Sequence, residues 1–264
     1  MDQLPTLSRD EGAMELATTM ANSDDTMRTI LGETLLSASM GRIREAGRTK
    51  CPENGEIRGP LERFPRAINL APCPREKGGT WHVHVTEDEI RYPTNSLPDM
   101  SNVIFGLTDV SIVVGTQTAD IIVAPENRKA AIGEFQNAIG SEVYEPRDVT
   151  AAIRAGRIMP AAARERVRDR MPELFYQIQT GYSDLDQTVR ELPDDVWETP
   201  PASGGEEAVA GNGTASMAFA PQSIEAAADS AEQVIGNAGL ANLVVSQALG
   251  TIVGNVVDSF FFNN

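Results

Sequence analysis

Both histidines of this 264-residue chain, His82 and His84, lie two positions apart in the stretch Gly-Thr-Trp-His-Val-His-Val. The β-branched and aromatic residues of this stretch predict a strand. Side chains alternate between the two faces of a strand, so both imidazoles point the same way. Two imidazoles on one face are an effective pair of zinc ligands, and a catalytic zinc needs a third protein ligand. Asp99, just inside the next predicted helix, is the best candidate for that ligand.

Ser96 lies three residues before Asp99, where it is expected to be the N-cap of this helix. Ser-Leu-Pro-Asp also matches a capping box, with aspartate in the place usually held by glutamate. Two interpretations therefore stay open. Either these residues and the two histidines form a metal site, or Ser96 and Asp99 only cap a helix and the histidines lie on the surface of a strand.

The elements around these residues predict an α/β (α+β) fold over residues 24–140. Apolar residues at helical spacing predict a helix over residues 24–47, with acidic residues at its start and Gly47 at its end. Short extended pieces interrupted by prolines follow in residues 56–72. The remaining predicted elements are a helix over 97–106, two buried strands over 109–117 and 119–126, and an amphipathic helix over 126–140.

The pattern His-x-His followed by Ser-x-x-Asp resembles the signature of the JAMM (MPN-plus, or JAB-domain) zinc metalloproteases. The order of the predicted elements in residues 25–140 is also similar to that of the family, although Val85 stands where the family usually has proline. The resemblance implies a JAMM/MPN-like three-layer domain with a central mixed sheet. It also implies that Zn²⁺ is the cofactor and that His82, His84 and Asp99 are its ligands.

The family further uses a glutamate on an upstream strand, typically within Glu-x-x-Gly, to activate water. Glu56 begins such a sequence, Glu-Ile-Arg-Gly, and the resemblance makes it the general base. It also makes Ser96 a helper that holds the oxyanion. Glu53, Glu87 and Glu89 remain alternative bases, because Glu56 is followed by a charged residue and a proline where the family has a smooth apolar strand.

An excess of carboxylates dominates the composition, with 38 acidic against 22 basic residues and a formal net charge of −16. Lysine occurs only three times, so arginine supplies almost all of the positive charge. Dense carboxylates with few lysines are typical of a high-salt cytoplasm, where salt screens their repulsion. We therefore expect a halophilic archaeon or its virus as the source. No basic face is visible, which argues against a nucleic-acid partner.

The two cysteines, Cys51 and Cys73, form no Cys-x-x-Cys motif. Two cysteines alone do not complete a structural zinc site, and the chain does not look stapled by disulfides. No charged segment followed by an apolar one marks a signal peptide near the N-terminus. We expect a protein of a high-salt cytoplasm, or of a virion if the chain is virus-encoded.

Three segments outside the predicted domain have distinct compositions. Residues 1–23 are polar and predict an N-terminal arm. Residues 141–198 mix acidic and basic residues at helical spacing and predict a helical extension. Residues 199–220 are rich in proline, glycine and serine and predict a flexible linker.

The last segment, residues 221–264, contains no lysine or arginine and predicts an apolar, glycine-containing helix. Gly250 and Gly254 have a spacing that lets helices approach closely. We expect this helix to mediate self-association or protein docking. A membrane span is an alternative by length, but polar residues interrupt the stretch and basic anchors are missing.

These observations lead to functions of different classes. The first is a zinc-dependent peptidase or isopeptidase that acts on a protein or peptide substrate, with water activated by zinc and a glutamate. The resemblance adds ubiquitin-like conjugates as a substrate. The alternative is a structural or assembly protein, such as a virion component, that uses a JAMM-like fold as a scaffold and residues 221–264 for docking. A membrane-tethered metalloprotease is a third hypothesis.

Overall fold

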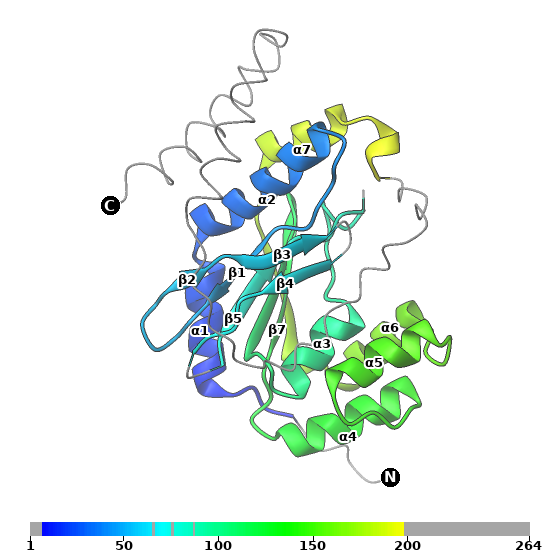
Figure 1. Cartoon of the computed structure of the whole chain (residues 1–264). Coiled ribbons are helices and arrows are strands. Elements are labelled where there is room, and N and C mark those ends of the chain that lie inside the picture. Colours follow the sequence, from blue (N-terminus) through cyan, green and yellow to red (C-terminus); the bar gives the residue numbers. More distant parts are fainter. Residues whose placement is uncertain (1–6, 65–66, 75–76, 87, 198–264) are drawn as a thin grey trace, which may run out of the picture. The chain divides into compact units, whose positions relative to one another are not determined.

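A mixed sheet forms the centre of the part of the chain that the computed structural model describes, residues 7–64, 67–74, 77–86 and 88–197. The strands are β1 (Gly47–Lys50), β2 (Ile57–Arg58), β3 (Pro60–Phe64), β4 (Ala67–Leu70), β5 (Gly79–His82), β6 (Val110–Val114), β7 (Thr118–Val123) and β8 (Phe175–Gln179). Six of them form one sheet in the order β2-β1-β5-β6-β7-β8, and β3 pairs with β4 in a second sheet (Figure 1). β5 and β6 are parallel, and the other neighbours are antiparallel.

Helices cover both faces of this sheet. They are α1 (Glu11–Ala21), α2 (Asp24–Ser39), α3 (Leu97–Ile104), α4 (Arg128–Ile139), α5 (Pro146–Arg154), α6 (Pro160–Arg170) and α7 (Ser183–Glu191), with short 3₁₀ turns at Pro172–Leu174 and Asp194–Trp197. Trp81 on β5 turns towards α1, where its indole donates a hydrogen bond to the Met20 carbonyl at 3.2 Å. The next residue, His82, turns to the opposite face, where it meets Asp99 of α3. Figure 1 shows α1 on one side of the sheet and α3 to α6 on the other.

Several predicted elements are confirmed. Every residue of β6 and β7 is buried, and the two strands pair directly, as their apolar runs indicated. The helix opened by Ser96 and the amphipathic helix that ends before Gly140 are also present. The chain is therefore a mixed α/β protein with a mixed sheet.

The predicted N-terminal arm is instead part of the core from residue 11 onwards. α1 buries Ala13, Leu16, Ala17 and Met20, which recur at the spacing of one helix face. Asp10 accepts a hydrogen bond from the Ala13 amide and caps the helix. The apolar periodicity of this segment is weak, because alanines make up half of the buried face.

The predicted helical extension, residues 141–198, also contains a strand. β8 pairs with β7 and forms the last strand of the sheet, so this segment belongs to the same unit as residues 24–140. β8 follows directly after a helical stretch and is only five residues long. Its strand conformation is decided by the open edge of β7, which a local pattern does not reveal.

The helix predicted over residues 24–47 ends eight residues early, at Ser39. Gly41 follows in the left-handed conformation with φ of 68°, and its amide donates to the Ala38 carbonyl at 2.8 Å. Glycine is favoured at this position after a helix because it has no Cβ. Residues 43–46 therefore lead into β1 and do not continue the helix.

Cys51 and Cys73 form a disulfide, contrary to the expectation of an unstapled chain. Cys51 directly follows β1, and Cys73 lies in the connection between β4 and β5. Because β1 and β5 are paired, the chain brings the two sulfur atoms together at the end of this pairing. Their spacing in the sequence alone contains no sign of that pairing.

The linker predicted at residues 199–220 and the apolar tail predicted at residues 221–264 lie outside the described residues. Among the described residues, no helix is both long enough and apolar enough to cross a membrane.

The close approach of β1 to β5 at Gly47 gives a test of this packing. A Cβ atom added at Gly47 would lie 2.5 Å from the Trp81 carbonyl oxygen and 3.1 Å from the His82 Cβ. We expect Gly47→Ala to force the strands apart and to lower the free energy of unfolding by about 1–3 kcal/mol in urea denaturation. Gly133→Ala is the control, because nothing lies within 4 Å of the added atom in α4. It should be neutral or stabilise by up to about 1 kcal/mol; equal stability of both variants would contradict the close packing.

Asp186 of α7 is a buried carboxylate that joins this helix to the loop before α3. Its Oδ1 accepts hydrogen bonds from Arg91 Nε at 2.9 Å and from Thr116 Oγ1 at 3.0 Å, and its Oδ2 accepts one from Arg190 Nη2 at 2.8 Å. The hydrogen bonds from Arg91 hold the pKa of Asp186 well below its ordinary value of 3.8, against the opposing effect of burial. The charged form is thus stabilised in the folded state.

A group whose pKa is lowered by folding contributes stability above its ordinary pKa and loses it as the pH falls. We expect Asp186→Asn to lower the free energy of unfolding by about 2–4 kcal/mol at pH 7, since it removes the buried negative charge that pairs with Arg91 and Arg190. The difference from the wild type should stay constant down to about pH 5 and then shrink with further acidification. Urea denaturation of both proteins between pH 7 and pH 3 measures it, and a difference that grows in acid would contradict the assignment.

Candidate metal centre

The two histidines lie side by side on the α3 face of the sheet. His82 is the last residue of β5, and the strand pairing continues past it, because the Val83 amide donates to the Ala46 carbonyl at 3.0 Å. Val83 is fully buried on the opposite face. Both imidazoles are buried, with ring centroids 5.1 Å apart. The predicted alternation of side chains along this strand is confirmed.

Asp99, on α3, faces both imidazoles. Its Oδ1 lies 3.3 Å from His82 Nε2, and its Oδ2 lies 3.4 Å from His84 Nε2. Two ligands that each lie about 2.0–2.1 Å from a tetrahedral ion are about 3.3 Å apart. The three side chains offer ligand atoms within 4.8 Å of one another, so this group could hold a metal ion.

The hydrogen bonding of the group also fits an ion. His82 Nε2 is buried and has no hydrogen-bond partner among the described residues. The nearby Asp99 oxygen does not satisfy it, because the contact lacks the geometry of a hydrogen bond. A buried nitrogen without a partner is costly, and a metal ion would accept its lone pair.

The charges around the histidines favour a cation in the same place. Burial alone would lower the pKa of His84, but the carboxylates of Asp99 and Glu89 raise it from 6.5 to about 10. Burial acts to raise the pKa of Asp99, but the two histidines hold it well below its ordinary value of 3.8. Without an ion, a proton on His84 balances the carboxylates. A divalent cation bound between the same atoms would take over that role.

Glu89 lies beside the other nitrogen of His84. Its Oε1 is 3.6 Å from His84 Nδ1, and its Oε2 accepts a hydrogen bond from Thr86 Oγ1 at 2.8 Å. The interaction with His84 lowers the pKa of Glu89 from 4.5 to about 2. The second nitrogen of a metal-binding histidine almost always donates to a carboxylate, a backbone carbonyl or a water, which orients the ring. Its position therefore makes Glu89 an orienting partner of His84, away from the nitrogen that faces Asp99.

Glu45 is a further carboxylate beside the histidines, and the sequence pattern did not predict it there. Gly47 pairs with His82, so Glu45 lies opposite His84 and on the same face. It is only 7% exposed, and burial raises its pKa from 4.5 to about 7, although both histidines act to lower it. Glu45 was hidden because the helix before it was predicted to run on to Gly47. The glycine at position 41, a typical residue after a helix end, was the signal that could have revealed it.

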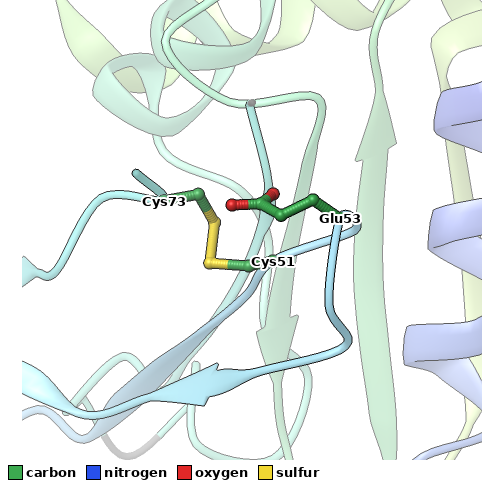
Figure 2. A group of neighbouring side chains, drawn as sticks. All are labelled: Cys51, Glu53 and Cys73. Atoms are coloured by element: carbon green, nitrogen blue, oxygen red, sulfur yellow. A yellow bond between two sulfur atoms is a disulfide. The ribbon is translucent and has the colours of Figure 1, made fainter. Parts of the chain in front are cut away.

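Glu56 lies elsewhere. It occupies the turn between β1 and β2, where its side chain is 46% exposed and lies 3.5 Å from Arg58. The Cys51 amide donates to the Glu56 carbonyl, which puts this residue at the far end of β1 from Gly47. Four residues of strand separate those ends, or about 13 Å. Glu56 is therefore not brought together with the histidines, Glu53 lies near the disulfide (Figure 2), and Glu87 is outside the described residues.

Ser96 and Asp99 do form the predicted capping box. Ser96 Oγ accepts from the Asp99 amide at 3.3 Å, and Asp99 Oδ2 accepts from the Ser96 amide at 2.8 Å and from the Ser96 hydroxyl at 2.6 Å. The two interpretations of this motif are thus compatible. The cap fixes Asp99 Oδ2 and leaves Oδ1 facing His82.

A second buried network holds the residue before this cap. Asp120 on β7 is fully buried and accepts hydrogen bonds from the Asn95 amide at 2.7 Å and from Asn95 Nδ2 at 2.9 Å. Arg168 of α6 forms an ion pair with the other oxygen of Asp120. The network therefore connects the sheet and α6 to the start of α3. No local sequence motif predicts these contacts.

Comparison with models of known protein families, with curated proteins and with solved structures gives no match. What the chain does is therefore inferred from the geometry and chemistry of the site.

The role of Asp120 in positioning the site can be tested through metal affinity. We expect Asp120→Asn to weaken zinc binding by about 10-fold or more, because it loosens the segment that carries Asp99. Asp109→Asn is the matched control, since it also removes an aspartate–arginine pair, 2.6 Å long, but at the opposite end of the sheet. Competition with a chromophoric chelator measures both affinities. Equal affinity for Asp120→Asn and wild type, or equal losses in both variants, would refute the positioning role.

Proposed function

We propose that the protein is a zinc-dependent peptidase or isopeptidase, with the ion held by His82, His84 and Asp99. The observation that carries the proposal is the spacing of 3.3–3.4 Å between the imidazole nitrogens and the carboxylate oxygens. Two nitrogens and one oxygen with a fourth position left for water are the ligand set of catalytic zinc sites. Magnesium and calcium prefer oxygen alone, so this donor set favours a transition-metal ion, and we propose zinc because the resemblance implies it.

Zinc, when bound, supplies Lewis-acid chemistry, since it polarises a carbonyl and lets water act as a nucleophile near neutral pH. The chain itself must then move a proton, and Glu45 is suited to this task. Its burial makes this carboxyl group more basic than an ordinary glutamate. A carboxylate of this kind beside the ion can accept a proton from water and return it to the leaving amine.

Glu45 is a further residue that matches the pattern of the JAMM zinc metalloproteases. The resemblance implied a glutamate on a strand upstream of the histidines, and Glu45 precedes a strand that pairs with theirs. We therefore propose Glu45 in the role first given to Glu56. Ser96 orients Asp99 through its hydroxyl, and its role as a helper at the oxyanion stays a prediction.

The alternative function, a scaffold in an assembly, rests on the apolar tail over residues 221–264. This tail lies outside the described residues, so self-association, docking and a place in a virion stay predictions. The same holds for the halophilic source and for ubiquitin-like conjugates as substrates.

Metal content and hydrolysis test the proposal together. Protein purified in high salt without reductant should contain one zinc per chain, and His82→Ala should contain none. Glu45→Gln should keep its zinc but lose hydrolysis of a quenched fluorescent peptide or a lysine-linked protein conjugate by about 100-fold or more. Glu56→Gln is the matched control and should keep both.

Two outcomes would contradict parts of this proposal separately. A wild-type protein that takes up no zinc, even after incubation with the metal, would exclude the zinc enzyme. Zinc binding with equal activity in Glu45→Gln and Glu56→Gln would leave the metal site but remove Glu45 from catalysis.

A further inference from the structure

A second cluster of metal-ligating side chains lies at the opposite end of the β1–β5 pairing. It consists of Cys51, Cys73 and Glu53, whose two sulfur atoms and one carboxylate oxygen lie within 4.8 Å of one another. Figure 2 shows the Glu53 side chain extended over the disulfide, with its carboxylate turned towards the sulfur atoms. None of these residues takes part in the proposed zinc enzyme site.

The backbone around the cluster holds the two cysteines in place. Cys51 is fully buried, and its amide donates to the Glu56 carbonyl while its carbonyl accepts from the Gly55 amide, both at 2.9 Å. Gly78 packs against Cys73, since an added Cβ would lie 2.6 Å from the Cys73 sulfur. The hydrogen bonds of Cys51 come from the main chain, so they do not depend on the bond between the sulfur atoms.

Glu53 supplies an open and uncommitted carboxylate. The side chain is exposed, and within the described part of the chain it has no hydrogen bond or ion pair. It projects from the tight turn that joins β1 to β2, which Gly55 closes with φ of 69°. The cluster therefore combines a buried residue, Cys51, and a half-buried one, Cys73, with an exposed carboxylate, so that solvent reaches it on the side of Glu53.

We propose that this cluster is a redox-gated metal site, in which the reduced cysteines and Glu53 bind a thiophilic divalent cation such as zinc. In the oxidised chain the sulfur atoms are bonded to each other and are not ligands. In the reduced chain they offer two thiolates, and with the carboxylate they provide three ligands and leave a fourth position to water. Thiolate and carboxylate are both zinc ligands, and thiolate selects against magnesium and calcium.

The chemistry balances with an ordinary thiol as the reductant. Two thiol molecules donate two electrons and two protons to the S–S bond and become a disulfide, and Cys51 and Cys73 become free thiols. Binding of the cation then releases the two thiol protons to water. Exchange with the disulfide of that thiol reverses both steps: the disulfide takes two electrons from the cysteine thiolates and two protons from water, the Cys51–Cys73 bond forms again and the ion is released. Metal binding and the disulfide thus exclude each other.

The structural change that this exchange requires is small. Two thiolates that each lie about 2.3 Å from a tetrahedral zinc are about 3.8 Å apart. The Cα atoms of Cys51 and Cys73 lie 5.4 Å apart. Rotation of the two side chains is therefore enough to bring the sulfur atoms to that spacing. The disulfide and the metal-bound form thus close the same loop between β1 and β5.

Zinc stoichiometry in the two redox states tests the inference independently of the proposed enzyme site. In a His82→Ala background, the oxidised protein should bind no zinc, and protein reduced with a phosphine should bind one equivalent. In the wild type, the reduced protein should bind one equivalent more than the oxidised one. Cadmium should add a thiolate charge-transfer band in the ultraviolet only after reduction.

Variants of the cluster complete the test. Cys73→Ser should abolish the extra equivalent, and Glu53→Gln should weaken its binding by about 10-fold or more while both thiols remain. Glu62→Gln, on the neighbouring hairpin, is the control and should bind as the parent does. Reduced protein that binds no additional zinc, or free thiols in protein never exposed to a reductant, would overturn the redox-gated site.

Discussion

The antiparallel register between β1 and β5 is the constraint on which both clusters of reactive side chains depend. Because Gly47 stands opposite His82, Glu45 faces His84 on the same side of the sheet. The absent side chain of Gly47 lets the strands approach beside the imidazoles. The same ladder ends where the two cysteines meet, so it also sets the position of the disulfide. A slip of one residue would turn the Glu45 carboxylate to the other face of the sheet.

The pKa values of the candidate metal centre are shifted because several charged groups are buried together. Three carboxyl groups, those of Glu45, Glu89 and Asp99, interact with the pair of imidazoles. Burial of carboxylates is costly unless opposite charge is near. The two raised pKa values have different causes, because the carboxylates raise the pKa of His84 against the effect of burial, whereas burial raises the pKa of Glu45. A divalent ion would supply positive charge beside all of these carboxyl groups.

Arginine supplies the positive charge beside two other buried carboxylates. The buried carboxylates of Asp120 and Asp186 are each paired with arginine, from α6 in one case and from α7 and the loop before α3 in the other. The planar guanidinium group can donate several hydrogen bonds to one carboxylate, which a lysine does not match. The scarcity of lysine in this acidic chain thus leaves its internal ion pairs to the side chain best suited to them.

Features that depend on neighbouring residues follow from local sequence. The alternation of a strand put His82 and His84 on one face, the Ser-x-x-Asp pattern formed a helix cap, and two apolar runs became buried strands. Other features follow from contacts between distant segments: Glu45 and not Glu56 lies beside the histidines, the cysteines are paired, β8 joins the sheet, and Asp120 holds the loop before the cap. Each of these depends on strand register or on contacts between residues more than twenty positions apart. Local hydrogen bonding and hydrophobic periodicity carry no information about such pairings, because the energy that selects them comes from packing of the whole sheet.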